Sequence, residues 1–126
     1  MKEHIIFDVD GVLLDYDKSF LKHIRGKGIS VSDDYWLGLP NLIDHIVDFS
    51  QHDDFMEIEA LPGAVEAVDM LSLYYELHIV SAPGTSEKTS FMRVQNILSL
   101  FPSIKEDNIT LLPLGGSKKE ELSRFR

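Results

Sequence analysis

Hydrophobic and polar residues follow two different patterns along the chain, and the change of pattern divides it. An apolar run over residues 4–9 predicts a strand that ends at Asp10-Gly11. From Leu61-Pro62-Gly63 onward, helical and extended patterns alternate: helix over 64–75, strand over 76–81, helix over 87–100, strand over 108–112 and helix from Ser117. Such alternation is typical of a parallel sheet joined by right-handed crossovers.

The spacing of apolar residues also predicts which helix faces pack into the core. The predicted stripes are Val65, Val68, Met70 and Leu71 in the first helix, and Phe91, Val94, Ile97 and Leu98 in the second. Residues three or four positions apart share one face of a helix, so we expect a packing role for both stripes and no role in binding a cofactor.

The segment after the first strand interrupts this alternation and predicts a helical insertion. Its apolar residues recur at helical spacing: Phe20, Leu21 and Ile24, then Leu39, Leu42, Ile43, Ile46 and Val47. We therefore predict one domain with a core of residues 1–15 and 61–126 and a small helical cap of residues 16–60.

Composition narrows the possible functions. The 126 residues include 12 basic and 21 acidic side chains, giving a net charge of −9, and residues 12–60 alone carry ten acidic and four basic residues. This charge argues against binding a long nucleic acid, which requires a basic surface. The chain has no cysteine and no apolar run long enough for a membrane span or signal peptide, so we expect a cytoplasmic protein without thiolate chemistry.

The strongest chemical signal is Asp8-Val9-Asp10-Gly11 at the end of the first strand. Side chains at positions i and i+2 of an extended chain point to the same side, so the two carboxylates can converge. Their repulsion would be relieved by a hard cation with oxygen ligands, and Mg²⁺ is the cation we expect. The alternative is that Asp10-Gly11 is only the turn of a β-hairpin.

Two weaker signals follow later strands. Ser81 ends an apolar strand before Ala82-Pro83-Gly84, where its hydroxyl and the following N–H groups could donate to an anion, although a plain turn explains the same residues. Ser117 can cap a helix that begins with Lys118 and Lys119. Lysines there oppose the helix dipole, which favours either a phosphate-binding charge or a frayed terminal helix.

Other candidate side chains lie in the predicted insertion. Tyr35 and Trp36 could stack on a base or sugar, but core packing or surface anchoring also accounts for them. A crowd of histidines and carboxylates could bind a metal: His45, His52, Asp44, Asp48, Asp53 and Asp54. Because these residues show no clear ligand spacing, a solvated acidic face is the preferred interpretation.

Taken in order, these motifs resemble those of the haloacid dehalogenase-like (HAD) superfamily of phosphohydrolases. The stretch Asp8-Val9-Asp10-Gly11-Val12 is similar to the first HAD motif, Ser81 to the second and Lys118 to the third. The segment Leu61-Pro62-Gly63-Ala64-Val65-Glu66 resembles the return from cap to core, and the Ser81-Ala82-Pro83 variant is most similar to the 5'(3')-deoxyribonucleotidase-like branch. The resemblance implies a Rossmann-like α/β fold, with helices flanking the parallel sheet.

The resemblance also implies roles for individual residues. Asp8 would be the nucleophile that forms an aspartyl-phosphate, and Asp10 the general acid and base. Mg²⁺ would be held by Asp8 and by the backbone carbonyl of Asp10. The phosphate would be bound by Gly11, Ser81, Ala82 and Lys118, with Lys119 as the alternative lysine.

One part of the family pattern is missing from this sequence. The fourth motif, an acidic loop after a further strand, does not occur, and Asp107 cannot replace it because it precedes Lys118 and follows no apolar strand. In the family's strand order this would make the first strand an edge strand and truncate the sheet. An edge carrying Ile5-Ile6-Phe7 invites self-association or a protein partner.

Two functions are therefore predicted as alternatives. The first is a Mg²⁺-dependent phosphatase acting on a small phosphomonoester, such as a nucleotide. The second is a truncated or degenerate relative that binds a phosphorylated ligand or a protein without catalysis. Dependence of hydrolysis on Asp8 distinguishes them.

Overall fold

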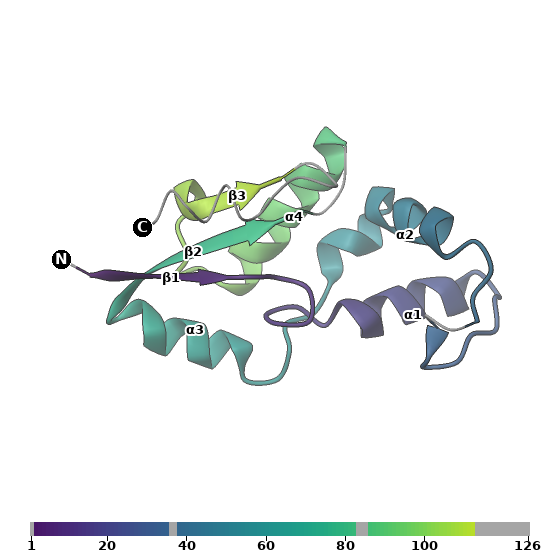
Figure 1. Cartoon of the computed structure of the whole chain (residues 1–126), viewed down its shortest axis with the longest axis horizontal. Coiled ribbons are helices and arrows are strands. Elements are labelled where there is room, and N and C mark those ends of the chain that lie inside the picture. Colours follow the sequence, from purple (N-terminus) through teal and green to yellow (C-terminus); the bar gives the residue numbers. More distant parts are fainter. Residues whose placement is uncertain (1, 36–37, 83–85, 113–126) are drawn as a thin grey trace.

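Three parallel strands organise the molecule. The computed structural model describes residues 2–35, 38–82 and 86–112. In this part, β1 (Glu3–Phe7), β2 (Tyr75–Ser81) and β3 (Ile109–Leu111) form a sheet in the order β1-β2-β3. Figure 1 shows all three strands running in the same direction. The predicted parallel α/β sheet is confirmed, whereas the helix expected from Ser117 lies outside the described residues.

Strand register explains which residues form the core. Ile5 pairs with Leu77 and Phe7 with Ile79, so these four side chains lie on one face of the sheet. They belong to the same hydrophobic core as buried residues of the two helices α3 (Ala64–Ser72) and α4 (Glu87–Leu100). The last five residues of β2 are all buried, as expected for the central strand of a parallel sheet.

Local capping signals set where these two helices begin. Gly63 precedes α3 in a left-handed conformation with φ of 83°, which glycine adopts without strain. The Ser86 hydroxyl accepts a hydrogen bond from the Thr89 N–H at 3.0 Å and caps α4. The bounds of α4 agree with the prediction, whereas α3 ends at Ser72, three residues earlier than expected.

The predicted core stripes are wrong at two positions. Met70 is 58% exposed because it lies two residues from the buried Val68, on nearly the opposite side of α3. Phe91 is 62% exposed, and Met92 takes the core position next to it. The buried face of α4 also carries polar residues, because the insertion packs against that face.

The described residues of the insertion include the helices α1 (Tyr16–Gly26) and α2 (Leu42–Gln51) and the 3₁₀ helix η2 (Asp53–Glu57). In Figure 1 the insertion lies beyond the carboxyl ends of the strands. Its two connections to the core run side by side and are paired by backbone hydrogen bonds: the Asp15 N–H donates to Glu59 and the Leu61 N–H to Leu13, each at 2.9 Å. The Asp15 side chain caps α1 by accepting from the Lys18 N–H at 3.2 Å.

Aromatic rings fill the interior of the insertion. Phe20, Phe49 and Phe55 are buried together, and the buried Tyr35 ring lies 5.0 Å from that of Phe20. The Tyr35 hydroxyl donates to Asp17 at 2.7 Å. Burial, followed by this hydrogen bond, raises the pKa of the Tyr35 phenol. Of the two interpretations of Tyr35, core packing is therefore confirmed, and Trp36 lies outside the described residues.

Polar side chains on the buried face of α4 attach the insertion to the core. The Thr89 hydroxyl donates to the Ser50 carbonyl at 2.7 Å and accepts from Gln51 Nε2 at 2.8 Å. The Asn96 amide donates to the Ile58 carbonyl at 3.0 Å. Each bond joins α4 to the end of α2 or the residue after η2, so the insertion and the core are fastened by buried hydrogen bonds.

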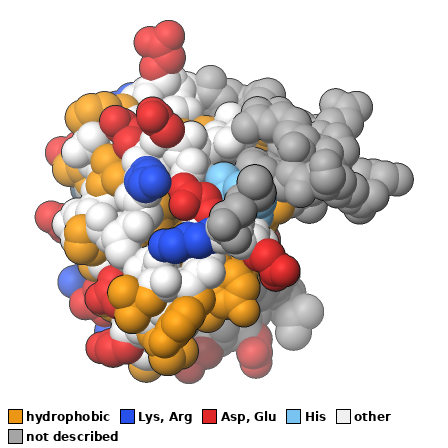
Figure 2. Space-filling view, turned by 90° about the vertical axis from the view of Figure 1, so that its left-hand side faces the viewer, with side chains coloured by type: hydrophobic (Ala, Val, Ile, Leu, Met, Phe, Trp, Pro, Cys, Tyr) orange, Lys and Arg blue, Asp and Glu red, His pale blue; other side chains and the backbone are white. Residues whose placement is uncertain are grey.

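The outer side of β1 has no partner strand among the described strands, so β1 is an edge strand here, as predicted. Figure 2 views the end of the molecule where the strands begin and shows hydrophobic side chains gathered in its lower part, among acidic ones. Exposed apolar residues of α3 and of the turn after it include Met70, Leu73 and Tyr74. None of the described helices is long and apolar enough to cross a membrane.

Candidate active site

The loop after β1 is a single tight turn built around the buried Val9. The Val9 carbonyl accepts from the N–H groups of Val12, Leu13 and Leu14 at 2.9–3.1 Å. Gly11 sits in the turn with φ of 78°, a left-handed conformation that favours glycine. The chain then continues into α1, and β1 pairs in parallel with β2, so the β-hairpin interpretation of Asp10-Gly11 is wrong.

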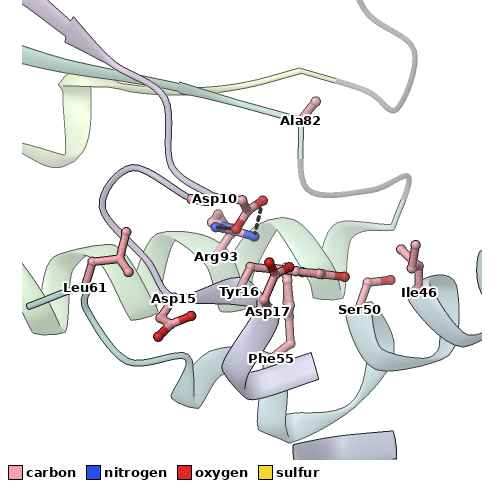
Figure 3. Close-up of a pocket in the computed structure, with 11 residues that line it drawn as sticks. Asp10, Asp15, Tyr16, Asp17, Ile46, Ser50, Phe55, Leu61, Ala82 and Arg93 are labelled. Carbon is pink, nitrogen blue, oxygen red and sulfur yellow. Dashed lines mark hydrogen bonds and ion pairs between the residues drawn. The ribbon is translucent and has the colours of Figure 1, made fainter. Parts of the chain in front are cut away.

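A cavity of about 580 Å³ opens between this loop and the insertion. Figure 3 shows its lining side chains, which come from the β1 loop, α1, α2, η2, the segment after β2, and α4. They are Asp10, Gly11, Asp15, Tyr16, Asp17, Ile46, Ser50, Phe55, Leu61, Ala82 and Arg93. This volume is in the range of small-molecule sites, which combine an apolar lining with a few polar groups.

The structure brings together part of the predicted site. Asp10, Gly11 and Ala82 all line the cavity. Asp8 is exposed just after β1, and its Oδ1 accepts from the Val9 N–H at 2.9 Å. Ser81 ends the neighbouring strand β2 and is buried, and its carbonyl accepts from the Leu112 N–H at 2.7 Å. Neither Asp8 nor Ser81 lines the cavity, and Lys118 and Lys119 lie outside the described residues.

Arg93 is a site residue that the sequence analysis missed. Its guanidinium binds both carboxylate oxygens of Asp10, Nη1 to Oδ1 at 2.9 Å and Nη2 to Oδ2 at 3.2 Å. The Arg93 side chain is only 1% exposed, and its guanidinium carbon lies 4.7 Å from the centre of the Phe55 ring. Arg93 Nε has no hydrogen-bond partner among the described residues. Asp10 thus supplies the counter-charge for a buried guanidinium.

The sequence contains a pattern that indicates a buried Arg93, but the apolar residues beside it on the same helix were given more weight. Thr89, Arg93 and Asn96 follow one another at spacings of four and three residues, which places three polar residues on one helix face. The prediction placed the core face on Phe91 and Val94 instead. On a helix that packs against both the sheet and the insertion, a stripe of polar residues indicates buried hydrogen bonds.

Tyr16 adds a hydroxyl to the wall of the cavity. Its ring packs edge-on against Phe49, with the centroids 5.5 Å apart. Burial, followed by the nearby charge of Asp10, raises the pKa of the Tyr16 phenol, while Arg93 opposes that rise. Tyr16 is therefore a neutral hydrogen-bonding group at neutral pH.

The oxygen donors at the end of β1 fit a magnesium ion. The exposed Asp8 carboxylate and the backbone carbonyl of Asp10 are hard oxygen ligands, and Mg²⁺ is commonly bound by one or two carboxylates together with water and phosphate oxygens. The Asp10 carboxylate itself is occupied by Arg93. A magnesium ion here would therefore be held by the Asp8 side chain and the Asp10 main chain.

Comparison with solved structures places the fold among HAD-type hydrolases. The HAD-hydrolase YfnB from Bacillus subtilis, whose structure is bound to magnesium, superimposes with a TM-score of 0.54 and 16% identity, over 87% of this chain and 63% of that one. A hydrolase from Streptococcus pneumoniae gives a TM-score of 0.57 and 14% identity, over 97% of this chain and 75% of its own. The chain therefore has a HAD-like α/β fold.

Sequence similarity points to a narrower group of relatives. The chain is 33% identical over 82 residues to the mitochondrial 5'(3')-deoxyribonucleotidase of Mus musculus and 34% identical over 84 residues to that of Homo sapiens. The matches cover 54% and 55% of this chain but 37% of each relative, so the chain spans little more than a third of the curated relatives it matches. No protein-family model matches the sequence. In sequence the chain is thus similar to part of these deoxyribonucleotidases, and in fold it is similar to a HAD-type hydrolase.

Proposed function

We propose that the protein is a Mg²⁺-dependent phosphatase that hydrolyses a small phosphomonoester, with Asp8 as the nucleophile. The observation that carries the proposal is the placement of Asp8 and Asp10 at the carboxyl end of β1, beside a cavity covered by the insertion. Ligands of open α/β sheets bind beyond the carboxyl ends of the strands. The similarity to deoxyribonucleotidases and to a magnesium-bound HAD-hydrolase supports the same chemistry.

Asp8 suits the attacking role because it is exposed just after β1. Its carboxylate oxygen would form a bond to phosphorus while the bond to the leaving alkoxide breaks, giving an aspartyl-phosphate that water then hydrolyses. A bound Mg²⁺, held by Asp8 and the Asp10 carbonyl, would supply charge neutralisation for the phosphoryl group. Gly11 and Ala82, which line the cavity, would lie beside the phosphate oxygens.

Asp10 would serve as the general acid and base, and Arg93 sets a condition on that role. Both oxygens of Asp10 are held by Arg93, so its carboxyl must turn from the guanidinium before it can donate a proton to the leaving group. Arg93 would then act as a positioning residue that determines when Asp10 faces the substrate.

The rest of the cavity would select the substrate. Phe55, Ile46 and Leu61 provide apolar surface, while Tyr16 and Ser50 provide hydroxyl groups. A flat base or a sugar ring suits this mixture, because rings pack against aromatic side chains and their polar edges bind hydroxyls. A nucleoside monophosphate is therefore the first substrate to test.

The test is phosphate release from a panel of phosphomonoesters that includes nucleoside monophosphates, measured on a monodisperse sample with and without Mg²⁺. Wild type is compared with Asp8→Asn, which keeps the shape of the side chain and removes its charge. Asp107→Asn is the matched control, because Asp107 is exposed and lies before β3, away from the cavity. The proposal predicts release that needs both Mg²⁺ and Asp8.

A folded wild-type protein that releases no phosphate, or an Asp8→Asn variant that releases it at the wild-type rate, would contradict the proposal. Absence of turnover together with saturable binding of a nucleoside monophosphate would instead support a binding protein. The pairing of Asp10 with Arg93 is the observation that favours this second function, since it occupies the proposed proton donor.

A further inference from the structure

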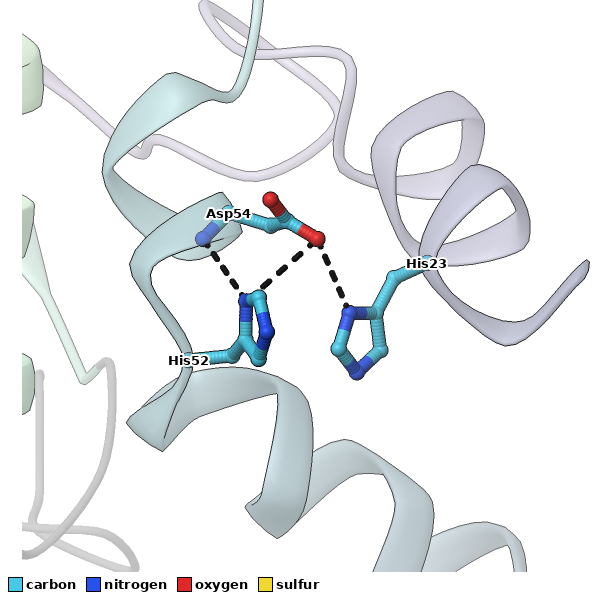
Figure 4. Close-up of side chains that lie close together, drawn as sticks. All are labelled: His23, His52 and Asp54. Atoms are coloured by element: carbon cyan, nitrogen blue, oxygen red, sulfur yellow. Dashed lines mark hydrogen bonds and ion pairs between the residues drawn. The ribbon is translucent and has the colours of Figure 1, made fainter. Parts of the chain in front are cut away.

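Three potential metal ligands converge on a side of the insertion that does not face the cavity. Figure 4 shows His23 from α1 together with His52 and Asp54 from the start of η2. His23 is 3% exposed, whereas His52 and Asp54 are about half exposed. None of the three lines the active-site cavity. Their ligand atoms all lie within 4.8 Å of one another.

The two distances from Asp54 to the histidines match those between ligands of a tetrahedral ion. Asp54 Oδ2 lies 3.1 Å from His23 Nδ1 and 3.3 Å from His52 Nδ1. Ligand atoms about 2.0–2.1 Å from a zinc ion, arranged as a tetrahedron, are about 3.3 Å apart. The Asp54 carboxylate therefore lies at ligand spacing from both imidazoles, and the three ligand atoms together lie within 4.8 Å.

The hydrogen bonding of His52 leaves a repulsive contact that a cation would relieve. The backbone N–H of Asp54 donates to His52 Nδ1 at 3.0 Å, so this nitrogen presents a lone pair. The same nitrogen faces Asp54 Oδ2, which can only accept. Two acceptors in contact repel each other. A metal ion between them would bond to both, and the single lone pair of His52 Nδ1 would then point at the ion instead of at the Asp54 N–H.

His23 has an outer partner of the kind that orients metal-binding histidines. Its Nε2 lies 3.4 Å from Asp48 Oδ2, and Asp48 is also bound by Lys27. A neutral imidazole carries one N–H, and donating it from Nε2 to Asp48 leaves the Nδ1 lone pair directed at the cluster. The Phe49 ring, 5.0 Å away, packs against the His23 ring and fixes its orientation.

We propose that His23 Nδ1, His52 Nδ1 and Asp54 Oδ2 bind a single Zn²⁺ ion. Two imidazole nitrogens favour zinc over magnesium, which prefers oxygen ligands. The fourth position faces a hollow of about 110 Å³ that is lined by His23 and Asp54 and also by Lys18 and Lys22. Glu57 and Glu59 also line this hollow, and Lys18 pairs with Glu59 at 2.6 Å, so a neutral water molecule suits the fourth position. The proposal is independent of the phosphatase activity.

The test measures Zn²⁺ affinity of the chelator-treated full chain against a chromophoric competitor. Wild type is compared with Asp54→Asn and with His52→Asn, which retains an acceptor for the N-cap of η2. His45→Asn is the matched control, because His45 lies on α2 outside the cluster. We expect one Zn²⁺ per chain, and an affinity at least about 10–100-fold weaker in both cluster variants but unchanged in the control.

Two further readouts identify the site. Co²⁺ should give the intense visible absorption of a tetrahedral complex in wild type and His45→Asn only, and excess Mg²⁺ should not displace Zn²⁺. The thermal midpoint should rise with Zn²⁺ in the same two proteins. Zinc binding that survives both cluster substitutions, that is lost in Asp8→Asn, or that is absent from wild type would overturn the proposal.

Discussion

The loop after β1 and the His23–His52–Asp54 cluster are both candidate metal sites, yet they differ in how they are assembled. Asp8 and Asp10 are two residues apart and offer oxygen atoms alone. His23 and Asp54 are 31 residues apart and meet only because α1 packs beside η2. The first suits a hard ion that binds phosphate oxygens, and the second a borderline ion that binds nitrogen. A local motif can thus be recognised in a sequence, whereas a site assembled by packing cannot.

The two aspartates of the loop also differ from each other. Asp8 is exposed, and its carboxylate accepts from the adjacent N–H. Asp10 is 42% exposed and neutralises an arginine from a helix 83 residues further along the chain. The loop therefore combines one exposed carboxylate with one carboxylate on which a buried charge depends.

The largest effect is expected when one residue of each site is substituted and both phosphate release and Zn²⁺ affinity are measured. Asp8→Asn should reduce phosphate release by about 10³-fold or more, because it removes the nucleophile, and should leave Zn²⁺ affinity unchanged. Asp54→Asn should weaken Zn²⁺ binding while retaining Mg²⁺-dependent hydrolysis. Parallel assays of turnover and zinc affinity check both halves. Loss of both properties in either variant would show that the two sites are one.

The next largest effect is a difference in the free energy of unfolding between variants of Asp10 and of Asp8. Asp10→Ala should lower the free energy of unfolding by about 3 kcal/mol, since it leaves the Arg93 guanidinium buried without a counter-charge. Asp8→Ala should cost less than about 1 kcal/mol, because Asp8 is exposed and its partner N–H can bind water. Urea unfolding curves of the two variants provide the measurement. Equal losses would show that Arg93 is satisfied by another group.

A smaller effect concerns how the insertion is held to the core. Thr89→Val keeps the shape of the side chain but removes the hydroxyl that joins α4 to Ser50 and Gln51, at an expected cost of about 1–3 kcal/mol. Ser90→Ala, one residue along the same helix, is the matched control. Hydrogen exchange should show faster opening of α2 in the Thr89 variant. Unchanged protection of α2 would mean that apolar packing alone holds the insertion.

The carboxylate of Asp48, which contacts His23, should give the stability of the fold a weak dependence on pH. Lys27, and then His23, hold the pKa of the Asp48 carboxyl below its usual value. Because this pKa is lower in the folded state, Asp48 adds stability above its unfolded pKa near 3.8 and loses it as the pH falls through the folded value. Asp48→Asn should flatten the decline of stability below pH 4 by less than about 1 kcal/mol, since the pair is exposed. Acid unfolding curves that coincide with wild type would contradict this.

The smallest expected change concerns the edge of the sheet. We propose that β1 pairs with a second chain through its outer side, as no described strand covers it. Ile6→Lys should then weaken self-association or partner binding without altering turnover, since a charge on an edge strand opposes pairing. Sedimentation over a concentration series measures this, with Lys2→Ala as a control for the same strand end. Identical masses for wild type and Ile6→Lys at every concentration would contradict the proposal.

Much of the fold follows from periods that are local in the sequence. The bounds of α4 were predicted correctly, because Ser86 is a recognisable helix cap. The position of β2 was predicted to within one residue, because a buried strand is a continuous run of apolar residues. The polar part of the inward side of α4 was not predicted, since apolar residues alone were assumed to define that side, although the predicted Ile97 is buried there. Thr89 and Asn96 are buried there because the insertion supplies their hydrogen-bond partners.

By itself, the sequence determined the order of helices and strands and the position of Asp8 and Asp10 at the end of the first strand. Tertiary structure alone decided that Asp10 pairs with Arg93, that Asp10 and Ala82 share a cavity that Ser81 does not line, and that His23 meets Asp54. The reason is physical: the hydrogen bonds of helices and the side-chain spacing of helices and strands involve residues a few positions apart, so a sequence shows them directly. Pairing between distant polar groups depends on how the insertion docks on α4, which no local pattern encodes.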